Sequence, residues 1–392
     1  MKILQINSVC GVGSTGRIME DLHWAYKCAG YSSMVAWGRQ SVDRIFKEES
    51  IRIGNTCDYL WHGLESRIFD NTGLGSRSAT KVFLREVELY EPDVIQLHNL
   101  HGYYLNIEYL FDFLSEYNKK VIWTLHDCWP FTGHCAFFNY IGCRKWQTQC
   151  YNCPLSRSYP KSIVLDRSFQ NYRLKEKLFT SINELVLVPV SNWLAELLRQ
   201  SFFKSFPVKV IHNGINSSIF KPTTSNLRNK YRIGRKKIIL GVAFNWNDRK
   251  GLRDFQRLAQ LLPEDEYQIV LIGISDKQKR DLNPKILAIS KTNSPKELAQ
   301  WYTEANVFLN LTYEDNFPTV NLEAQECGTP VITYNTGGSI ESVPKDNIIN
   351  QGDIEAVEQR IKSDHLELIK GWDNMTMASE YIELIRTTTK KT

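Results

Sequence analysis

The chain has 392 residues, of which 42% are hydrophobic and 23% are charged. At about 150 residues per domain this length indicates two or three domains, and the composition excludes a disordered or low-complexity chain. The formal net charge of +5 does not call for a nucleic-acid partner, and it is compatible with an anionic ligand or a lipid surface. No apolar run approaches the roughly 18–20 residues that span a bilayer, and residues 1–7 lack the apolar core of a signal peptide. The sequence therefore predicts a cytoplasmic protein.

Runs of β-forming residues alternate with helix-compatible stretches in both halves of the chain. Strands that alternate with helices indicate βαβ units and a parallel sheet. Runs such as Ile238-Ile239-Leu240, apolar on consecutive residues, are typical of a sheet covered on both faces. We therefore predict an α/β fold with two doubly wound, Rossmann-like domains facing a cleft, with ligands beyond the carboxyl ends of the strands. The predicted strands cover residues 3–7, 34–37, 94–98, 121–125 and 185–190, and then 208–212, 238–244, 268–272, 307–311 and 331–334.

A turn rich in Gly, Asn, Ser and Pro follows residues 208–212 and marks a domain boundary. We predict an N-terminal domain over residues 1–207 and a C-terminal domain over residues 208–370. Residues 371–392 are expected to form a helix that packs back on the body. Residues 128–168 fit no βα unit and are expected to form a cysteine-rich insert of the first domain.

The segment Gly11-Val12-Gly13-Ser14-Thr15-Gly16 follows the first predicted strand and matches G-x-G-x-x-G. A dinucleotide site also needs an acidic residue at the end of the second strand, but that strand ends with Trp37-Gly38-Arg39-Gln40. A glycine turn at a helix N-terminus still presents N–H groups to an anion. Gly13 and Gly16 are therefore candidates for binding an anionic group, and a tight turn without a ligand is the alternative.

Two carboxylates frame the turn that follows residues 307–311. Asp315 is expected near the start of a helix that ends at Gly328, and Glu323 about one turn into that helix. Two carboxylates placed in this way can accept hydrogen bonds from several sugar hydroxyls. A solvated helix start with an N-terminal acid is the alternative.

This segment resembles the E-x7-E motif of the family 4 retaining glycosyltransferases, which have the GT-B fold. Asp315 replaces the usual first Glu, and Pro318 replaces the usual Gly after the Phe, so we expect a changed sugar pocket rather than lost activity. The resemblance covers most of the chain. It extends to the glycine loop, Thr124-Leu125-His126-Asp127, Ile211-His212-Asn213-Gly214-Ile215, Arg249-Lys250-Gly251 and Gly337-Gly338.

The resemblance implies a nucleotide-diphosphate sugar donor, with UDP favoured over GDP, held mainly by the second domain. Glu323 would take the ribose hydroxyls, and Asp315 the hydroxyls of the transferred sugar. Arg249 and Lys250 would neutralise the diphosphate, whose charge grows in the transition state; a basic turn before a helix is the alternative for this pair. The backbone of Asn316, Phe317, Pro318 and Thr319 would approach the sugar and phosphates.

His126 ends the strand at residues 121–125, and in the resembling family this His lies by the transferred sugar. Asp315 and His126 are thus the catalytic candidates, although a hydrogen-bonded structural His is the alternative for His126. His98 and His101 are expected on the acceptor side. The family retains anomeric configuration by front-face attack, with the donor phosphate assisting deprotonation of the acceptor. Because the chain contains no Asp-x-Asp, we predict chemistry that needs no metal and no other cofactor.

Five cysteines fall within 26 residues of the predicted insert. Cys150-Tyr151-Asn152-Cys153 is a C-x2-C pair suited to zinc, and Cys135 and Cys143 could complete a tetrahedral site. Cys128 and His134 are spare candidates. Free thiols and a disulfide are the alternatives to structural zinc.

The resemblance therefore implies a retaining glycosyltransferase that moves a sugar to a glycan acceptor, expected to be lipid-linked, in surface polysaccharide biosynthesis. The mild basicity is compatible with peripheral contact at the inner face of the membrane, and no nucleic-acid partner is expected. Two alternatives stay open. One is a sugar-nucleotide epimerase of the same architecture, and the other is a non-catalytic, zinc-stabilised carbohydrate-binding protein.

Overall fold

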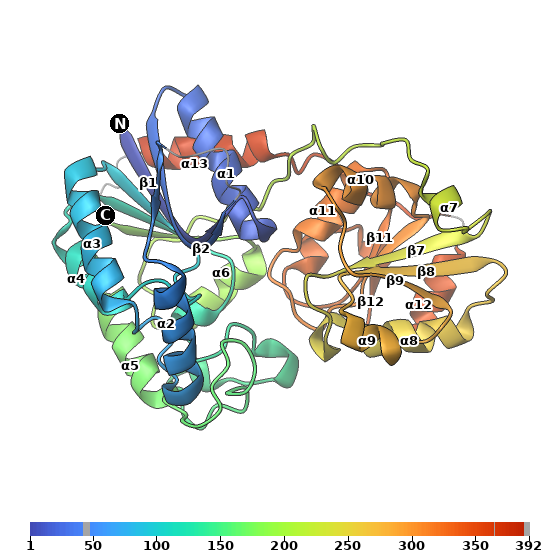
Figure 1. The fold of residues 1–392 in the computed structure, drawn as a ribbon, viewed down its shortest axis with the longest axis horizontal. Helices are drawn as coiled ribbons and strands as arrows, with labels where there is room; N and C mark the ends of the chain where they lie inside the picture. Colours follow the sequence, from blue (N-terminus) through green and yellow to red (C-terminus); the bar gives the residue numbers. More distant parts are fainter. Residues whose placement is uncertain (42–47, 364, 388–392) are drawn as a thin grey trace. The chain divides into compact units, whose positions relative to one another are not determined.

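The structure is a computed structural model that describes residues 1–41, 48–363 and 365–387. Its internal contacts divide the chain into two compact units, one formed by Met1–His212 with Met375–Thr392 and the other by Asn213–Asn374. Each unit is built on one six-stranded sheet (Figure 1). All recorded strand pairs are parallel. The predicted α/β fold with two parallel sheets is confirmed.

The first sheet has the strand order β3-β2-β1-β4-β5-β6. The chain moves outward from β1 on one side and then returns to β4 on the other side of β1, so the strand order reverses between β1 and β4. The strands are β1 (Lys2–Cys10), β2 (Ser32–Ser41), β3 (Ser50–Arg52), β4 (Val94–Leu97), β5 (Lys120–Leu125) and β6 (Leu185–Pro189). The helices are α1 (Gly13–Cys28), α2 (Thr56–Phe69), α3 (Arg77–Tyr90), α4 (Ile107–Glu116), α5 (Ser168–Phe179), α6 (Asn192–Arg199) and α13 (Asn374–Arg386).

The second sheet repeats this plan with the order β12-β11-β10-β7-β8-β9, and its reversal point lies between β7 and β10. The strands are β7 (Lys237–Val242), β8 (Tyr267–Ile272), β9 (Ile286–Ile289), β10 (Val307–Asn310), β11 (Val331–Tyr334) and β12 (Ile348–Ile349). The helices are α7 (Leu227–Lys230), α8 (Leu252–Leu261), α9 (Asp276–Arg280), α10 (Pro295–Glu304), α11 (Thr319–Glu326) and α12 (Ile354–Lys362).

The consecutive apolar residues of the central strands are buried on both faces of each sheet. In β5, Ile122 and Trp123 are both fully buried, although successive side chains of a strand point to opposite faces. Leu240 and Ile239 of β7 are buried in the same way. The hydrophobic core therefore lies on both sides of each sheet, which leaves the carboxyl ends of the strands as the place for polar side chains.

Helix α13 belongs to the first unit although it comes last in the sequence (Figure 1). Met377 and Tyr381 pack in the same hydrophobic cluster as Ile3 of β1. The Tyr381 hydroxyl lies 3.0 Å from Oγ1 of Thr124 in β5, and the Lys120 ammonium donates to the carbonyls at the end of the helix. Apolar burial and two polar contacts thus hold this helix on the first sheet.

Residues 208–212 differ from the expectation of a strand in the second half. They form only an isolated bridge, Val208 with Leu187, and Lys209 and Ile211 donate backbone bonds to β6.

The segment between β5 and α5 contains three single-turn 3-10 helices, at Trp129–Phe131, Asn139–Ile141 and Lys145–Gln147. Of the helices in the described ranges, none has the length and apolar character to span a membrane.

Candidate functional site

A basic pair and an acid that are distant in the sequence meet at the carboxyl ends of β7 and β10. Nζ of Lys250 lies 2.5 Å from Oδ2 of Asp315, and Oδ1 of Asp315 accepts a 3.0 Å bond from the backbone N–H of Asn316. Arg249 Nη1 donates a 2.5 Å bond to the carbonyl of Glu314. Both cationic residues are therefore tied to the loop that carries the carboxylate.

Gly251 explains how these loops approach so closely. It has a φ of +73°, and a Cβ at this position would overlap the carbonyl oxygen of Leu311. Only glycine combines this backbone conformation with this contact. The Asn247 side chain closes the turn by accepting the backbone N–H of Lys250 at 3.1 Å, so the turn holds Lys250 against the end of β10.

The Gly337-Gly338 segment after β11 joins the same place. The N–H of Gly338 donates a 3.0 Å bond to the Asp315 carbonyl. Gly337 has a φ of +51°, and a Cβ there would overlap that same carbonyl oxygen. β11, β10 and β7 are neighbours in the sheet. Three motifs that are separate in the sequence therefore come together at the carboxyl ends of these strands, beside the reversal point between β7 and β10.

The charges in this cluster modify one another. Burial acts to raise the pKa of Asp315, but the Lys250 ammonium and the Arg249 guanidinium outweigh it and hold that pKa below its ordinary value. Burial lowers the pKa of Lys250, and the Asp315 carboxylate works against this. The carboxylate therefore stays ionised and can accept hydrogen bonds, and the adjacent cations can balance added phosphate charge.

Glu323 is placed differently from Asp315. It lies within α11, is 1% exposed, and its Oε2 accepts a 3.0 Å bond from the Tyr302 hydroxyl in α10. The expected position about one turn into a helix agrees with the start of α11 at Thr319. Pro318 precedes this helix and offers no N–H group, so within residues 316–319 only Asn316, Phe317 and Thr319 have backbone donors.

A buried polar network below this edge was not found by the sequence analysis. Asn321 of α11 accepts from Asn310 at 2.9 Å and donates to Ser339 at 3.2 Å and to Ser342 at 3.0 Å. The Ser339 hydroxyl also lies 2.7 Å from Oγ1 of Thr333. The network links β10 and β11 to the segment after Gly338. Only the polar side chains within otherwise buried elements could have signalled it.

In the glycine loop of the first unit, Gly13 and Gly16 have different surroundings. A Cβ at Gly16 would lie 3.1 Å from the backbone N of Gly11 and 3.2 Å from Cγ2 of Val9, so Gly16 serves close packing of α1 on β1. Gly13 has a φ of +65°, and a Cβ added to it would meet no atom within 4 Å. The first turn of α1 has no side-chain cap and no acidic residue, which favours an anion there.

His98 and His126 lie together at the carboxyl ends of β4 and β5. Nδ1 of His98 is 3.0 Å from Nε2 of His126, and the two rings stack at an interplanar angle of 13°. Gln5 donates to the Met19 carbonyl, so its Oε1 accepts from Nε2 of His98 at 3.3 Å. His126 then donates to His98 through Nε2–H, which leaves Nδ1 as its acceptor atom.

Both imidazoles of this pair are neutral near pH 7. Burial lowers the pKa of His126 to about 4, and burial together with the neighbouring His126 lowers the pKa of His98. A neutral imidazole can accept a proton or a hydrogen bond, which an imidazolium cannot do. His126 is thus able to accept a hydrogen bond from a hydroxyl group.

His101 belongs to a second polar cluster that includes two residues not singled out by the sequence analysis. Its Nε2 lies 2.6 Å from Oδ2 of Asp127 and its Nδ1 lies 3.0 Å from the Tyr159 hydroxyl. Asp127 also accepts a 2.9 Å bond from the N–H of Trp129. Burial acts to raise the pKa of Asp127, but the His101 ring and these hydrogen bonds lower it. In the sequence, the position of Asp127 directly after His126 could have indicated that it belongs to this site.

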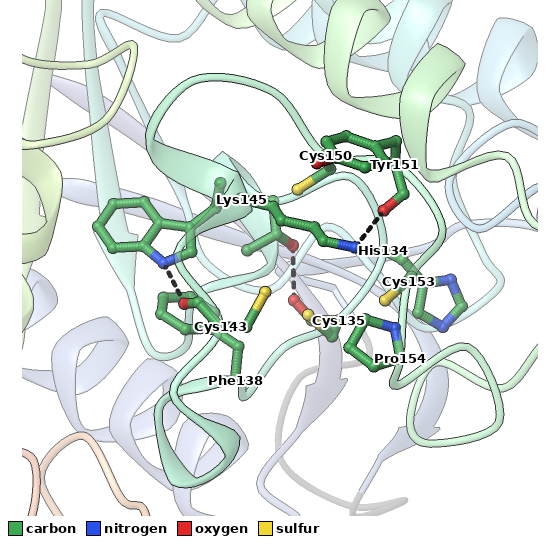
Figure 2. Close-up of a pocket in the computed structure, with 11 residues that line it drawn as sticks. His134, Cys135, Phe138, Cys143, Lys145, Cys150, Tyr151, Cys153 and Pro154 are labelled. Carbon is green, nitrogen blue, oxygen red and sulfur yellow. Dashed lines mark hydrogen bonds between the residues drawn. The ribbon is translucent and has the colours of Figure 1, made fainter.

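The four cysteines of the predicted zinc set, Cys135, Cys143, Cys150 and Cys153, line one small cavity of about 10 Å³ (Figure 2). All nine cysteines of the chain are free thiols, so the alternative of a disulfide is not seen. In the described ranges, no three His, Cys, Asp or Glu side chains are arranged so that they could hold a metal ion.

Comparisons with known proteins point to glycosyltransferases. A protein-family model described as "Glycosyl transferases group 1" matches residues 223–367. A candidate colanic acid biosynthesis glycosyl transferase, WcaC of Escherichia coli (strain K12), is 26% identical over 368 residues, which are 88% of this chain and 86% of that protein. The N,N'-diacetylbacillosaminyl-diphospho-undecaprenol alpha-1,3-N-acetylgalactosaminyltransferase of Campylobacter jejuni is 26% identical over 42% of this chain and 46% of its own.

Solved structures extend the likeness to the whole fold. Sucrose-phosphate synthase from Thermosynechococcus elongatus has a TM-score of 0.66 at 17% identity and covers 98% of this chain and 94% of its own. The HepE protein of Anabaena, solved in complex with UDP, has a TM-score of 0.65 at 14% identity and covers 98% of this chain and 99% of its own.

Proposed function

We propose that this chain, a glycosyltransferase with a group 1 domain over residues 223–367 and the GT-B fold, transfers a hexose from a UDP-sugar. The acceptor in this proposal is a lipid-linked glycan, and the anomeric configuration is retained. GDP-sugar is the second donor candidate. The acceptor belongs, in this proposal, to surface polysaccharide biosynthesis, the setting named for the WcaC relative. The UDP complex of the HepE structure supports the choice of base.

The observation that carries the proposal is the contact between Lys250 and Asp315 at the edge where β7, β10 and β11 end. The Asp315 carboxylate is assigned to hydroxyls of the transferred sugar. Lys250 and Arg249 are assigned to the diphosphate, whose negative charge grows as its bond to the sugar breaks. These two cations supply the charge that a divalent metal supplies in other transferases, so no metal is assigned to the reaction.

Three further groups are assigned to the donor. Glu323, whose carboxylate is oriented by Tyr302, takes the ribose hydroxyls. The backbone N–H groups of Asn316, Phe317 and Thr319 approach the sugar and the phosphates. The uncapped start of α1 at Gly13 offers N–H groups to a phosphate, whereas Gly16 keeps a packing role.

The reaction needs no protein base in this proposal. The acceptor oxygen attacks the anomeric carbon on the face from which the diphosphate leaves, so that the new C–O bond forms as the bond to the phosphate oxygen breaks. The acceptor proton moves to that phosphate oxygen. Neutral His126 accepts a hydrogen bond from a hydroxyl of the transferred sugar through Nδ1, and His98 fixes its ring. His98 and His101 contribute to the acceptor side.

A lipid-linked acceptor is supported by an exposed apolar surface of the first unit. It consists of Leu60, Trp61, Leu64 and Phe69 of α2 together with residues 163–165. Backbone bonds from Ile163 to Arg67 and from Leu165 to Ile68 hold the two segments side by side. Arg67 and Lys161 are exposed at the same place. We assign this membrane-contact surface to an anionic lipid bilayer, which accommodates both apolar and basic side chains.

The experiment that tests the function is sugar transfer with a panel of UDP- and GDP-sugars and an acceptor with a polyprenyl diphosphate anchor. We expect transfer from a UDP-hexose, a product with the donor's anomeric configuration by NMR, and no dependence on added Mg²⁺ or Mn²⁺. An inverted product would overturn the retaining assignment. Donor epimerisation without transfer would favour the epimerase, and donor binding without turnover the carbohydrate-binding protein.

A further inference from the structure

The cavity in the segment between β5 and α5 is lined by sulfur atoms from four separate positions. Figure 2 shows the thiols of Cys135, Cys143, Cys150 and Cys153 turned toward the same space. Thr132, Phe138 and Trp146 supply other parts of the wall. Such convergence is unusual for free thiols, because cysteines that serve only as small apolar residues have no reason to share one cavity.

Hydrogen bonds to the backbone hold the cysteines in this orientation. Thr132 Oγ1 donates to the carbonyl of Cys135 at 2.6 Å, and Trp146 Nε1 donates to the carbonyl of Cys143 at 3.0 Å. The Lys145 ammonium donates to the carbonyls of Tyr151 and Asn152, between the other two cysteines. These bonds fix the backbone next to all four cysteines.

A buried histidine beside the cavity has an atom that the protein leaves unpaired. His134 and Asp70 form a 2.6 Å ion pair through Nδ1, and both side chains are 1% exposed. Nε2 of the same ring is buried and has no hydrogen-bond partner. His134 lines the cavity next to Cys153 (Figure 2). A buried ring nitrogen without a hydrogen-bond partner is rare in native proteins, so this atom indicates a missing partner in the cavity.

We propose that Cys135, Cys143, Cys150 and Cys153 bind one Zn²⁺ tetrahedrally, with Nε2–H of His134 donating to the Cys153 thiolate. Four thiols release four protons and form four Zn–S bonds of about 2.3 Å. The hydrogen bonds that link Asp70, His134 and the Cys153 thiolate then orient this zinc ligand without contacting the metal, as such partners do in zinc sites. The buried Lys175 donates to the carbonyls of Trp129 and Thr132 in the same segment.

As they are placed in the described part of the chain, the cysteines do not form a group that could hold a metal, so their side chains have to move to bind one. A change of χ1 between staggered rotamers moves a sulfur by about 3 Å without moving the backbone. The bound ion would fix the segment that follows His126 and Asp127, including Tyr159, whose hydroxyl contacts His101. This inference does not depend on the identity of the donor or the acceptor.

The first experiment is elemental analysis of the full-length protein after expression with zinc and dialysis into metal-free buffer. We expect about one zinc per chain in the wild type and none in the C150S/C153S variant. The matched control is C28S/C57S, which removes two exposed thiols outside the cavity and should keep the zinc. Metal-free wild type, equal zinc in C150S/C153S, or a disulfide among the four cysteines would overturn the proposal.

A second measurement uses the wild-type chain alone and so does not depend on the folding of a variant. Replacement of zinc by Co²⁺ should give the intense visible bands of a tetrahedral site and a sulfur-to-cobalt charge-transfer band in the near ultraviolet. The weak absorption of octahedral cobalt would overturn a four-thiolate site.

The role of His134 is tested by competition with a chelator. We expect H134Q to weaken zinc binding about 10–100-fold, the usual effect of removing such an outer partner, with the stoichiometry unchanged. The control is H62Q, which removes another buried imidazole, bonded to Ser76 and Gly75. Equal zinc affinities for H134Q and the wild type would contradict the assigned hydrogen bond.

Discussion

The Lys250 ammonium lies 2.5 Å from the Asp315 carboxylate, although 65 residues separate the two in the sequence. The approach depends on two glycines, because Gly251 sits against Leu311 and Gly337 against the Asp315 carbonyl. The cation that we assign to the leaving phosphate and the anion that we assign to the sugar hydroxyls are thus held in one corner of the second unit. We therefore expect single substitutions in this corner to have large effects on sugar transfer.

We predict that K250A lowers kcat about 10²–10³-fold, the effect of removing one group that stabilises developing transition-state charge. D315N should lower kcat as well, because the amide cannot replace a carboxylate acceptor beside a cation. Initial rates of sugar transfer measure both effects. K279A, in the exposed helix α9, is the control and should retain the wild-type rate. Unchanged turnover in K250A would refute its role at the diphosphate.

G337A should damage both stability and donor use. A left-handed conformation costs a non-glycine residue roughly 1–2 kcal/mol, and the added Cβ would also displace the Asp315 carbonyl. G234A is the matched control, because Gly234 has a φ of +65° and open space around it. We expect G234A to lose only stability in urea unfolding, and G337A to raise the KM for the donor in addition. Equal KM values in the two variants would argue against the close approach as a determinant of the site.

Stability should fall with acidification between pH about 6.5 and about 4, in part because of His126. Its pKa is lowered to about 4 by burial, so in this window the unfolded chain binds a proton that the folded chain excludes. The full effect of such a shift is about 3 kcal/mol. Urea unfolding across the window should give a shallower pH slope for H126N than for the wild type. H365Q changes an exposed histidine and should leave the slope as it is. An H126N slope equal to that of the wild type would contradict a neutral His126.

Replacement of the apolar side chains of the membrane-contact surface should weaken binding to lipid. Trp61 and Val164 are 65% and 66% exposed, so W61S/V164S should fold normally and sediment less with vesicles that contain anionic phosphatidylglycerol. L89S is the control, since Leu89 is 78% exposed on α3, outside this surface. Increased salt should weaken the binding of the wild type, because part of the attraction is electrostatic. Equal sedimentation of W61S/V164S and L89S would remove this surface from consideration.

Local sequence patterns were enough to predict much of this protein. The alternation of apolar runs with helical stretches determined two parallel sheets, because buried parallel strands require consecutive apolar residues and crossover helices. The motifs around His126, Lys250, Asp315 and Glu323 determined the chemistry to look for. The strands β3, β9 and β12 escaped prediction. β3 and β12 have only three and two residues, which carry too little periodicity.

Only the tertiary structure decided which of these residues meet. It joined Lys250, Asp315 and Gly337 at the ends of three neighbouring strands, bonded Glu323 to Tyr302, and packed Gly16 closely against Gly11 and Val9. It also placed the unpaired Nε2 of His134 beside four cysteines. The reason is physical: propensity and spacing act over a few residues, whereas the order of strands in a sheet and the fit of glycine against a distant carbonyl depend on the whole folded chain.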